Sequence, residues 1–139
     1  MIDILEKIKQ EEGFCADMYD CPSGYKTIGY GINLETTPIP EPIARAWTKY
    51  LISGLNLDIA EHDWYRKLGH DRRMIILDMC YQIGVNGVLR FKKMIAAIEG
   101  GDYEEAANQM MDSKWARHDS PARALRNATI MRDGNGSTI

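Results

Sequence analysis

The segment from Asp71 to Ile83, DRRMIILDMCYQI, places apolar side chains on almost every side of a helix. A helix at a protein surface keeps one polar face, so a helix that is apolar all round has to be enclosed by other elements. Gly84 follows the segment and offers a place for this helix to end. The segment predicts a buried central helix, and a chain of 139 residues is long enough to enclose it.

Helical periodicity recurs on both sides of this segment. Apolar residues follow spacings of three and four in five further stretches: 2–12, 43–51, 57–68, 91–98 and 103–111. Ser120-Pro121 is typical of one more helix start, whereas Ser53-Gly54 and Asn86-Gly87 are expected to interrupt helices. Residues 18–34 alternate strand-like runs with turn residues, which indicates an antiparallel hairpin or a three-stranded sheet.

These elements predict an α+β fold that is mostly helical, with one small antiparallel sheet near the N-terminus. We expect a single domain over residues 1–134. Its small sheet lobe would cover about 13–37, and its helical lobe about 70–134 together with the helix 2–12. Residues 135–139, NGSTI, are expected to form a loose tail.

Composition excludes several classes of protein. The formal net charge of -3 provides no basic surface of the kind that binds nucleic acid. No window approaches the roughly 18 apolar residues of a membrane span, and the N-terminus lacks a basic region followed by an apolar stretch. Three cysteines fit no zinc-ligand spacing. We expect a chain made in the cytoplasm with reduced cysteines, no membrane anchor, no metal and no cofactor.

Glu12 shares a helical face with Leu5 and Ile8, which predicts that its carboxyl group is partly buried. Desolvation disfavours the charged form of a carboxyl group, and a general acid that works near neutral pH needs its protonated form. The alternative is a carboxylate that pairs with an arginine as a structural strut. The local pattern leaves both readings open.

Cys21 lies in a turn nine residues after Glu12, before the strand that carries Thr27. A cysteine in a turn is more often an inert small apolar residue than a nucleophile. Thr27 by itself is an ordinary β-branched strand residue. Taken separately, these two positions therefore leave their role undecided.

Taken together, these residues resemble a known family. The sequence has Glu12, eight residues, Cys21, five residues and Thr27, and then Ile28-Gly29-Tyr30-Gly31. With the preceding EEGF, this resembles the Glu-x8-Asp/Cys-x5-Thr signature of phage-type lysozymes, the muramidase endolysins of glycoside hydrolase family 24. The stretches CYQIGVNGVLRFKKM and DYEEAANQMMDSKWARHDSPARALRNATIMRDG are similar to the helical lobe of that family. The resemblance covers residues from about 4 to 134.

The resemblance implies a bilobed lysozyme-like fold that hydrolyses the β-1,4 bond between N-acetylmuramic acid and N-acetylglucosamine in peptidoglycan. Glu12 would be the general acid, Cys21 would replace the usual second carboxylate, and Thr27 would hold the hydrolytic water. Arg123 matches an arginine that pairs with the catalytic acid. Five further residues match positions that bind substrate in the cleft: Gly31, Leu34, Tyr81, Gln82 and Gln109.

The chain departs from the family at two places. It is shorter between residues 35 and 70, which affects the expected length of the helix that connects the lobes. Ile32 stands where many relatives carry a histidine, so a salt bridge built on that histidine cannot form here.

A cysteine cannot simply replace a carboxylate, because a free thiol has a pKa of about 8.5 and is mostly protonated at pH 7. Lys26 or a helix terminus would have to stabilise the thiolate. Cys21 could activate a water molecule, attack the sugar, or only position water with Thr27, and we favour activation or positioning. Because some relatives regulate a catalytic cysteine by disulfide exchange, a bridge between Cys15 and Cys21 is a further possibility.

The resemblance also implies partners and a location. A phage-type endolysin is made in the host cytoplasm and reaches the periplasmic cell wall once a holin has permeabilised the membrane. We expect a monomer whose partner is bacterial peptidoglycan. Two other functions stay open at this point: a lytic transglycosylase, which forms an anhydro sugar, and a wall-binding module of lysozyme fold with impaired catalysis.

Overall fold

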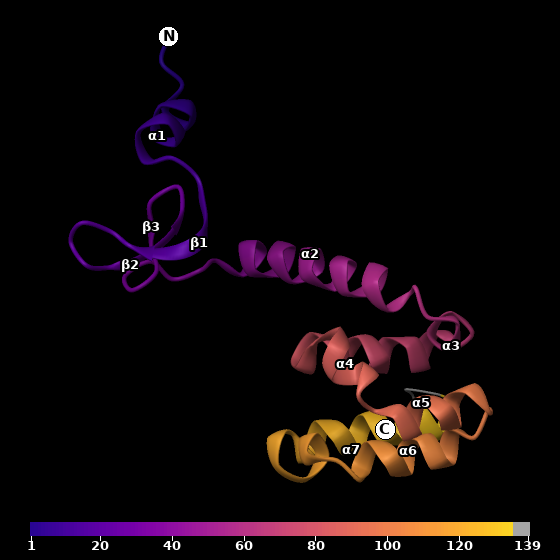
Figure 1. The fold of residues 1–139 in the computed structure, drawn as a ribbon. Helices are drawn as coiled ribbons and strands as arrows, with labels where there is room; N and C mark the ends of the chain where they lie inside the picture. The colour runs from indigo at the N-terminus through magenta and orange to yellow at the C-terminus, as the bar shows by residue number, and fades with distance from the viewer. Residues whose placement is uncertain (135–139) are drawn as a thin grey trace. The chain divides into compact units, whose positions relative to one another are not determined.

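A computed structural model of the chain describes residues 1–134, so the predicted loose tail at 135–139 lies outside the described residues. The fold is α+β, with most residues in helices and one three-stranded antiparallel sheet, as the sequence predicted. The chain divides into two compact units, Met1–Ala46 and the part that begins at Trp47. Figure 1 shows the order of the elements along the chain. None of the described helices is long and apolar enough to cross a membrane.

The first unit consists of one helix and the sheet. Helix α1 spans Ile4–Glu12, where the Asp3 carboxylate accepts hydrogen bonds from the first free N–H groups and Gly13 ends the helix at a positive φ of 70°. Strands β1 (Cys15–Asp20), β2 (Lys26–Gly29) and β3 (Ile32–Asn33) follow in the order β1-β2-β3. The predicted sheet is therefore confirmed.

Register in the sheet is set by short turns on both sides of β2. Asp20 pairs with Lys26 and Tyr19 with Thr27 across β1 and β2, and Thr27 pairs with Asn33 across β2 and β3. Thr27 thus stands in the middle strand, with only 3% of its surface exposed. The turns place the residue after β1, Cys21, close to the start of β2.

The remaining chain is helical. Its elements are α2 (Glu41–Ile59), α3 (Asp63–Arg66), α4 (His70–Leu89), α5 (Lys92–Glu99), α6 (Tyr103–Met111), the π-helix η1 (Trp115–Asp119) and α7 (Pro121–Asp133). The boundary between the two units falls within α2. Pro121 occupies the first turn of α7 as predicted, although the Ser120 side chain does not cap that helix.

Two predicted helix interruptions are wrong. Ser53-Gly54 lies inside the continuous helix α2, because an exposed glycine in a helix costs only about 1 kcal/mol relative to alanine. The helix expected over 57–68 is absent as one element, since α2 ends at Ile59 and the short α3 follows. Helical hydrogen bonding also continues through Asn86-Gly87 to Leu89, and the break in α4 is at Gly84, with φ 79° and ψ 161°.

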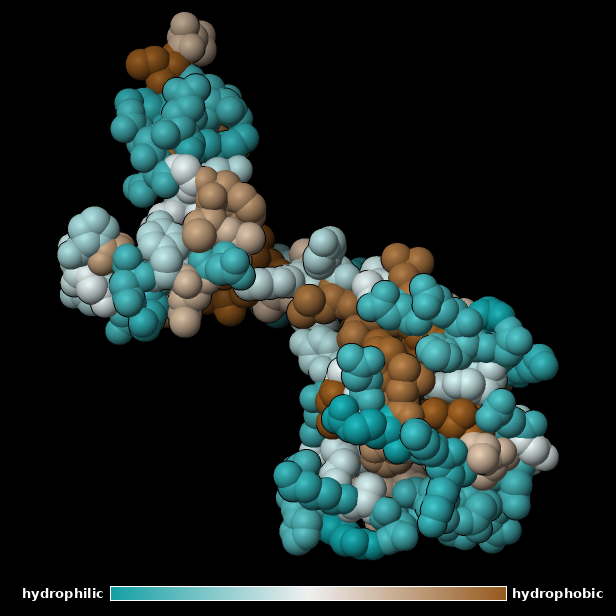
Figure 2. Space-filling model, in the orientation of Figure 1, coloured by the Kyte–Doolittle hydropathy of each residue, from teal (hydrophilic) through white to brown (hydrophobic). Residues whose placement is uncertain are grey.

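The core of the second unit forms around α4, which confirms the predicted buried central helix. Ile76, Met79 and Cys80 of α4 are fully buried, and they pack in one cluster with Met110 of α6 and Met131 of α7. Figure 2 shows that much of the surface of this unit is hydrophilic in the same view, while apolar surface gathers over α2. The exposed apolar side chains of α2 include Trp47, Tyr50 and Leu57.

A charged network joins α4 to α7 inside this unit. The Arg123 Nε atom donates to the Asp78 Oδ2 atom at 2.9 Å, and a second guanidinium nitrogen of Arg123 donates to Asp78 Oδ1. The Asn127 amide donates to Asp78 Oδ2 at 2.8 Å. Hydrogen bonding by Arg123 is the main reason why the pKa of Asp78 lies below its ordinary value.

We expect Asp78→Asn to lower the free energy of unfolding by about 1 to 2 kcal/mol at pH 7. The size is modest because the two side chains are about one-third exposed, at 36% and 35%, and solvent screens them. A depressed carboxyl pKa stabilises the folded state above the unfolded pKa of about 3.9, and this stabilisation is lost as the pH falls through the folded pKa.

Urea unfolding of wild type and Asp78→Asn at pH 7 and pH 3 measures this effect. The difference between the two proteins should shrink at pH 3, whereas the control Asp133→Asn should change little at either pH. A difference of equal size at both pH values would contradict the ion-pair explanation.

Candidate functional site

Glu12 is the last residue of α1, and its carboxyl group lies against the backbone of Gly31. A Cβ atom on Gly31 would lie 2.6 Å from the carboxyl carbon of Glu12, and the φ of Gly31 is +69°. The positive φ favours glycine at this position, and a side chain here would also displace the Glu12 carboxyl group. The Phe14 and Tyr30 rings, 5.5 Å apart, pack beside this end of α1. The first unit thus brings together two of the predicted site residues.

Within the first unit Glu12 is exposed, so α1 and the sheet do not supply the expected partial burial of its carboxyl group. The reason is that no residue of α1 is buried. Leu5 and Ile8, which share its helical face, are themselves 60% and 43% exposed, so they do not shield the carboxyl group from water.

Cys21 and Thr27 are brought together by the turn between β1 and β2. The Cys21 N–H donates to the Tyr25 carbonyl at 2.9 Å, and the Gly24 N–H donates to the Cys21 carbonyl at 2.8 Å. The Thr27 hydroxyl donates to the same Tyr25 carbonyl at 2.9 Å. One carbonyl oxygen therefore holds both predicted site residues.

The turn also stabilises the thiolate of Cys21. Hydrogen bonding by the Tyr25 backbone is the largest of the effects that lower the pKa of Cys21, and the backbones of Ser23 and Gly24 act in the same direction. Desolvation opposes them. A pKa below the ordinary 9.0 increases the thiolate fraction at neutral pH.

The group that stabilises the thiolate differs from the two that the sequence suggested. The Lys26 ammonium pairs with the Asp20 carboxylate at 2.6 Å, and this pair raises the pKa of Lys26. Lys26 is not among the groups that lower the pKa of Cys21, and neither is a helix terminus. Backbone N–H groups of a tight turn perform this role instead.

Cys15 stands at the opposite end of β1 from Cys21. A strand rises by about 3.3 Å per residue, so the two Cα atoms are roughly 15 to 20 Å apart. A disulfide needs Cα atoms within about 7 Å. Both cysteines are free, and the Cys15 thiol donates to the Asp17 carbonyl at 3.1 Å. A Cys15–Cys21 bridge is therefore incompatible with an intact β1.

Among the described residues no group of three or more His, Cys, Asp or Glu side chains could hold a metal ion.

The remaining predicted residue of the first unit is Leu34, whose side chain is 43% exposed. Its N–H donates to the Lys26 carbonyl at 2.7 Å and extends the pairing of the sheet.

In the second unit, Tyr81 and Gln82 are neighbours on α4, and Tyr81 is 46% exposed. Gln82 connects three elements: its Oε1 atom accepts from the Trp115 indole at 2.8 Å, and its amide nitrogen donates to the Ser120 hydroxyl. Gln109 on α6 donates to the Glu105 carboxylate at 2.7 Å. The sequence did not predict Trp115 and Ser120 as site neighbours, although both lie in the stretch DYEEAANQMMDSKWARHDSPARALRNATIMRDG quoted above.

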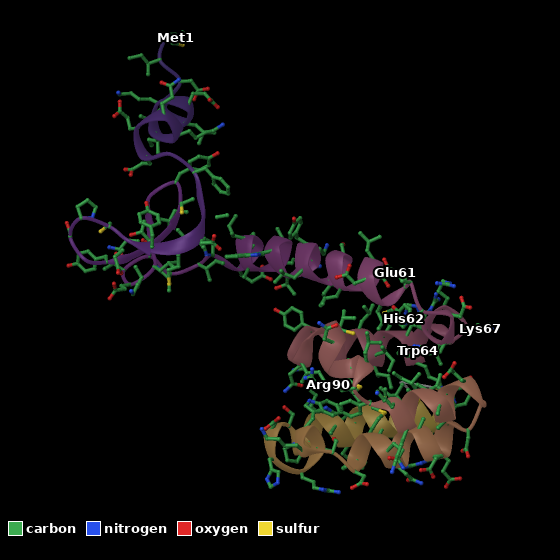
Figure 3. The ribbon with its side chains drawn as sticks, in the orientation of Figure 1. Met1, Glu61, His62, Trp64, Lys67 and Arg90 are labelled. Carbon is green, nitrogen blue, oxygen red and sulfur yellow. The ribbon has the colours of Figure 1, made fainter. Side chains whose placement is uncertain are left out.

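A cavity of about 620 Å³ opens beside Gln109. Apolar groups of Ile83, Phe91 and Trp115 line it, and its polar lining includes Ser113 and the cations Arg90, Lys92, Lys93 and Lys114. Figure 3 labels Arg90, which follows the end of α4. The mixture of aromatic, amide and charged groups is typical of a site for a polar ligand.

Arg123 forms its ion pair with Asp78 within the second unit. The predicted pairing of Arg123 with Glu12 joins residues of different units, and it stays a prediction. The same holds for a common cleft that contains Glu12, Gly31 and Leu34 on one side and Tyr81, Gln82 and Gln109 on the other.

Comparison with known proteins places this sequence in a family. The profile of the Phage lysozyme family matches residues 9–128, which include Glu12, Cys21, Thr27 and Arg123. The chain is 29% identical, over 94% of both proteins, to Probable T4-type lysozyme 1 of Dictyostelium discoideum. That alignment runs over 161 residues, more than the 139 of this chain, so the relative carries residues that this chain lacks.

A second relative is the Pre-baseplate central spike protein Gp5 of Enterobacteria phage T4. It is 26% identical over 96% of this chain, which corresponds to only 28% of the relative. Probable T4-type lysozyme 2 of Dictyostelium discoideum is 31% identical over 50% of the chain. Because the family profile covers most of the sequence, the chain belongs to the phage lysozyme family and is a glycoside hydrolase of the lysozyme type.

Proposed function

We propose that this protein is a peptidoglycan hydrolase that cleaves the β-1,4 bond between N-acetylmuramic acid and N-acetylglucosamine. The observation that carries the proposal is the turn of the first unit, where one carbonyl oxygen holds Cys21 and Thr27 together. The membership of the phage lysozyme family supports the substrate class.

In the proposed reaction, Glu12 is the general acid. Its carboxyl group donates a proton to the glycosidic oxygen as the bond between that oxygen and the anomeric carbon breaks, and the positive charge that develops on the sugar is then relieved by water. The contact of Glu12 with the Gly31 backbone supports this role, because a general acid has to be held at a defined place.

Cys21 and Thr27 act on the water molecule. The Thr27 hydroxyl gives its only proton to the Tyr25 carbonyl, so its lone pairs are free to accept a hydrogen bond from water. As a thiolate, Cys21 accepts the second proton of that water while the oxygen bonds to the anomeric carbon. Proton transfer from water to sulfur and from Glu12 to the leaving oxygen together balance the hydrolysis.

The second unit supplies binding groups in this proposal. Tyr81 is exposed, and Gln82 is held in a fixed position by Trp115 and Ser120. Gln109 lines the cavity of about 620 Å³. We further propose that the protein is a monomer, is made in the host cytoplasm and reaches the cell wall after a holin has opened the membrane.

The reaction products distinguish hydrolysis from transglycosylation. Wild-type protein should clear a suspension of purified cell walls and release muropeptides with reducing ends, whereas Glu12→Gln should reduce the rate by about 100-fold or more because the proton donor is lost. Mass spectrometry of the muropeptides gives the decisive result. Products lighter by one water would indicate a lytic transglycosylase, and wall binding without any release would indicate an inactive module.

The role of the thiolate predicts how activity depends on pH. The ratio of the wild-type rate to the Cys21→Ser rate should rise with pH as Cys21 ionises, through a pKa below 9.0, because the two proteins share the same general acid, Glu12. In Cys21→Asp the corresponding rise in rate should occur several pH units lower, because an aspartate side chain has a pKa of about 4. The serine hydroxyl of Cys21→Ser does not ionise in this pH range, so the rate of this variant should be about 100-fold lower.

These rates are measured under reducing conditions from pH 4 to pH 9, with Cys15→Ser as the control that should match wild type. Equal activity of Cys21→Ser and wild type across this range would exclude thiolate chemistry. A sugar-thioether adduct on Cys21, trapped in Glu12→Gln, would show that the sulfur attacks the sugar and does not act through water.

Gly31→Ala tests the contact between α1 and the sheet. The new Cβ atom would overlap the Glu12 carboxyl group and displace the proton donor, so the rate should fall by about 100-fold. The far-ultraviolet circular dichroism of the variant should stay close to wild type, because the change is local. Gly101→Ala is the matched control, since it also has a positive φ but no atom within 4 Å of a new Cβ. Equal losses in both variants would point to backbone strain as the cause.

A further inference from the structure

Glu35 lies just beyond β3, and its side chain reaches back to the start of β2. The Lys26 backbone N–H donates to Glu35 Oε2 at 2.7 Å. Asn33 fixes Glu35 in turn, because the Asn33 side-chain oxygen accepts from the N–H groups of Glu35 at 2.9 Å and of Thr36 at 3.2 Å. The carboxylate is therefore held by a local turn and aimed at one backbone N–H group.

This N–H group belongs to the peptide unit that joins Tyr25 to Lys26. The atoms of a peptide unit lie in one plane, so its N–H and C=O groups turn together. The C=O end of the unit is the Tyr25 carbonyl, which accepts from the Cys21 N–H and from the Thr27 hydroxyl, both at 2.9 Å. The Glu35 carboxylate thus binds the N–H group of this peptide unit, and the two residues proposed to act on water bind its C=O group.

An ionised acceptor forms a stronger hydrogen bond than a neutral one. A carboxylate on the N–H group also polarises the peptide unit and makes its carbonyl a better acceptor. The Thr27 hydroxyl has a single proton, which it donates to the Tyr25 carbonyl. A stronger Tyr25 carbonyl keeps the proton and leaves the oxygen lone pairs of Thr27 available to water.

The sheet does not depend on Glu35 for its pairing. The Lys26 carbonyl accepts from the Leu34 N–H at 2.7 Å, and Thr27 pairs with Asn33. Nor is Glu35 the main partner of the Lys26 ammonium, which is bound by Asp20 at 2.6 Å. The contact that distinguishes Glu35 is its hydrogen bond to the backbone.

We propose that Glu35 is a positioning residue, whose carboxylate fixes the Tyr25–Lys26 peptide unit and so orients the Thr27 hydroxyl and Cys21 toward the hydrolytic water. This role rests on the proposed hydrolase function, because it assigns the orientation of the two groups that act on water. Glu35 itself makes no contact with substrate in this role.

Kinetics on soluble peptidoglycan fragments test the effect on turnover. Glu35→Ala should reduce kcat by about 10- to 100-fold, because a reacting group is misplaced, while KM stays within about twofold. Glu35→Gln should recover most of the rate, since its amide oxygen still accepts from the Lys26 N–H. The control Glu6→Ala, on α1, should behave as wild type. A change of KM alone, or equal losses for Ala and Gln, would overturn the proposal.

A second measurement follows the turn itself and needs no enzymatic activity. Alkylation of Cys21 by iodoacetamide is recorded against pH in a Cys15→Ser background, where the remaining Cys80 is buried and has a pKa of about 11. The midpoint for Cys21 should move to higher pH in Glu35→Ala, because the turn N–H groups lose their fixed orientation, and it should stay near wild type in Glu35→Gln.

The two measurements separate the two proposals. A wild-type protein that releases no muropeptides would refute the hydrolase function, while the alkylation midpoint would still report on Glu35. A midpoint in Glu35→Ala that is unchanged would show that the turn does not need the carboxylate. A midpoint at lower pH would show that Glu35 acts on Cys21 only through its negative charge. Either result would overturn the positioning role.

Discussion

The Tyr25 carbonyl is the point on which the geometry of the first unit depends. It accepts from the Cys21 N–H and the Thr27 hydroxyl, and it shares its peptide plane with the Lys26 N–H that Glu35 binds. Hydrogen bonding by the backbone of this turn, above all that of Tyr25, lowers the pKa of the Cys21 thiol. A short backbone turn therefore supplies what a positively charged side chain would otherwise have to provide.

In the proposed reaction, this arrangement is what lets a thiol act where a second carboxylate is expected. An ordinary thiol is mostly protonated at neutral pH, whereas a thiolate that accepts several backbone hydrogen bonds forms more readily. The thiolate is stabilised in this way only while the turn keeps its conformation. The proposed role of Glu35 follows from this, since a carboxylate that holds one peptide plane limits the movement of Thr27 and Cys21 together.

Much of the fold could be predicted from local patterns. The all-round apolar segment 71–83 correctly indicated a buried helix, because only burial tolerates such a surface. Interruptions were predicted less well: the break at Gly84 is where the sequence indicated a helix end, but Gly54 sits within α2 and helical hydrogen bonding continues through Asn86-Gly87. Glycine only permits a break, and whether the chain bends there depends on packing that a local window does not contain.

The sequence by itself determined the family and the spacing of Glu12, Cys21 and Thr27, because the order of residues along a helix, turn and strand is local information. Tertiary structure decided the environments of these groups. It placed Gly31 against Glu12, left Glu12 exposed within the first unit, and gave Arg123 the carboxylate of Asp78 as a partner. It also assigned the stabilisation of the thiolate to backbone N–H groups and brought in Glu35. Backbone groups are the same in every residue, so only the folded chain shows which of them meet a given side chain.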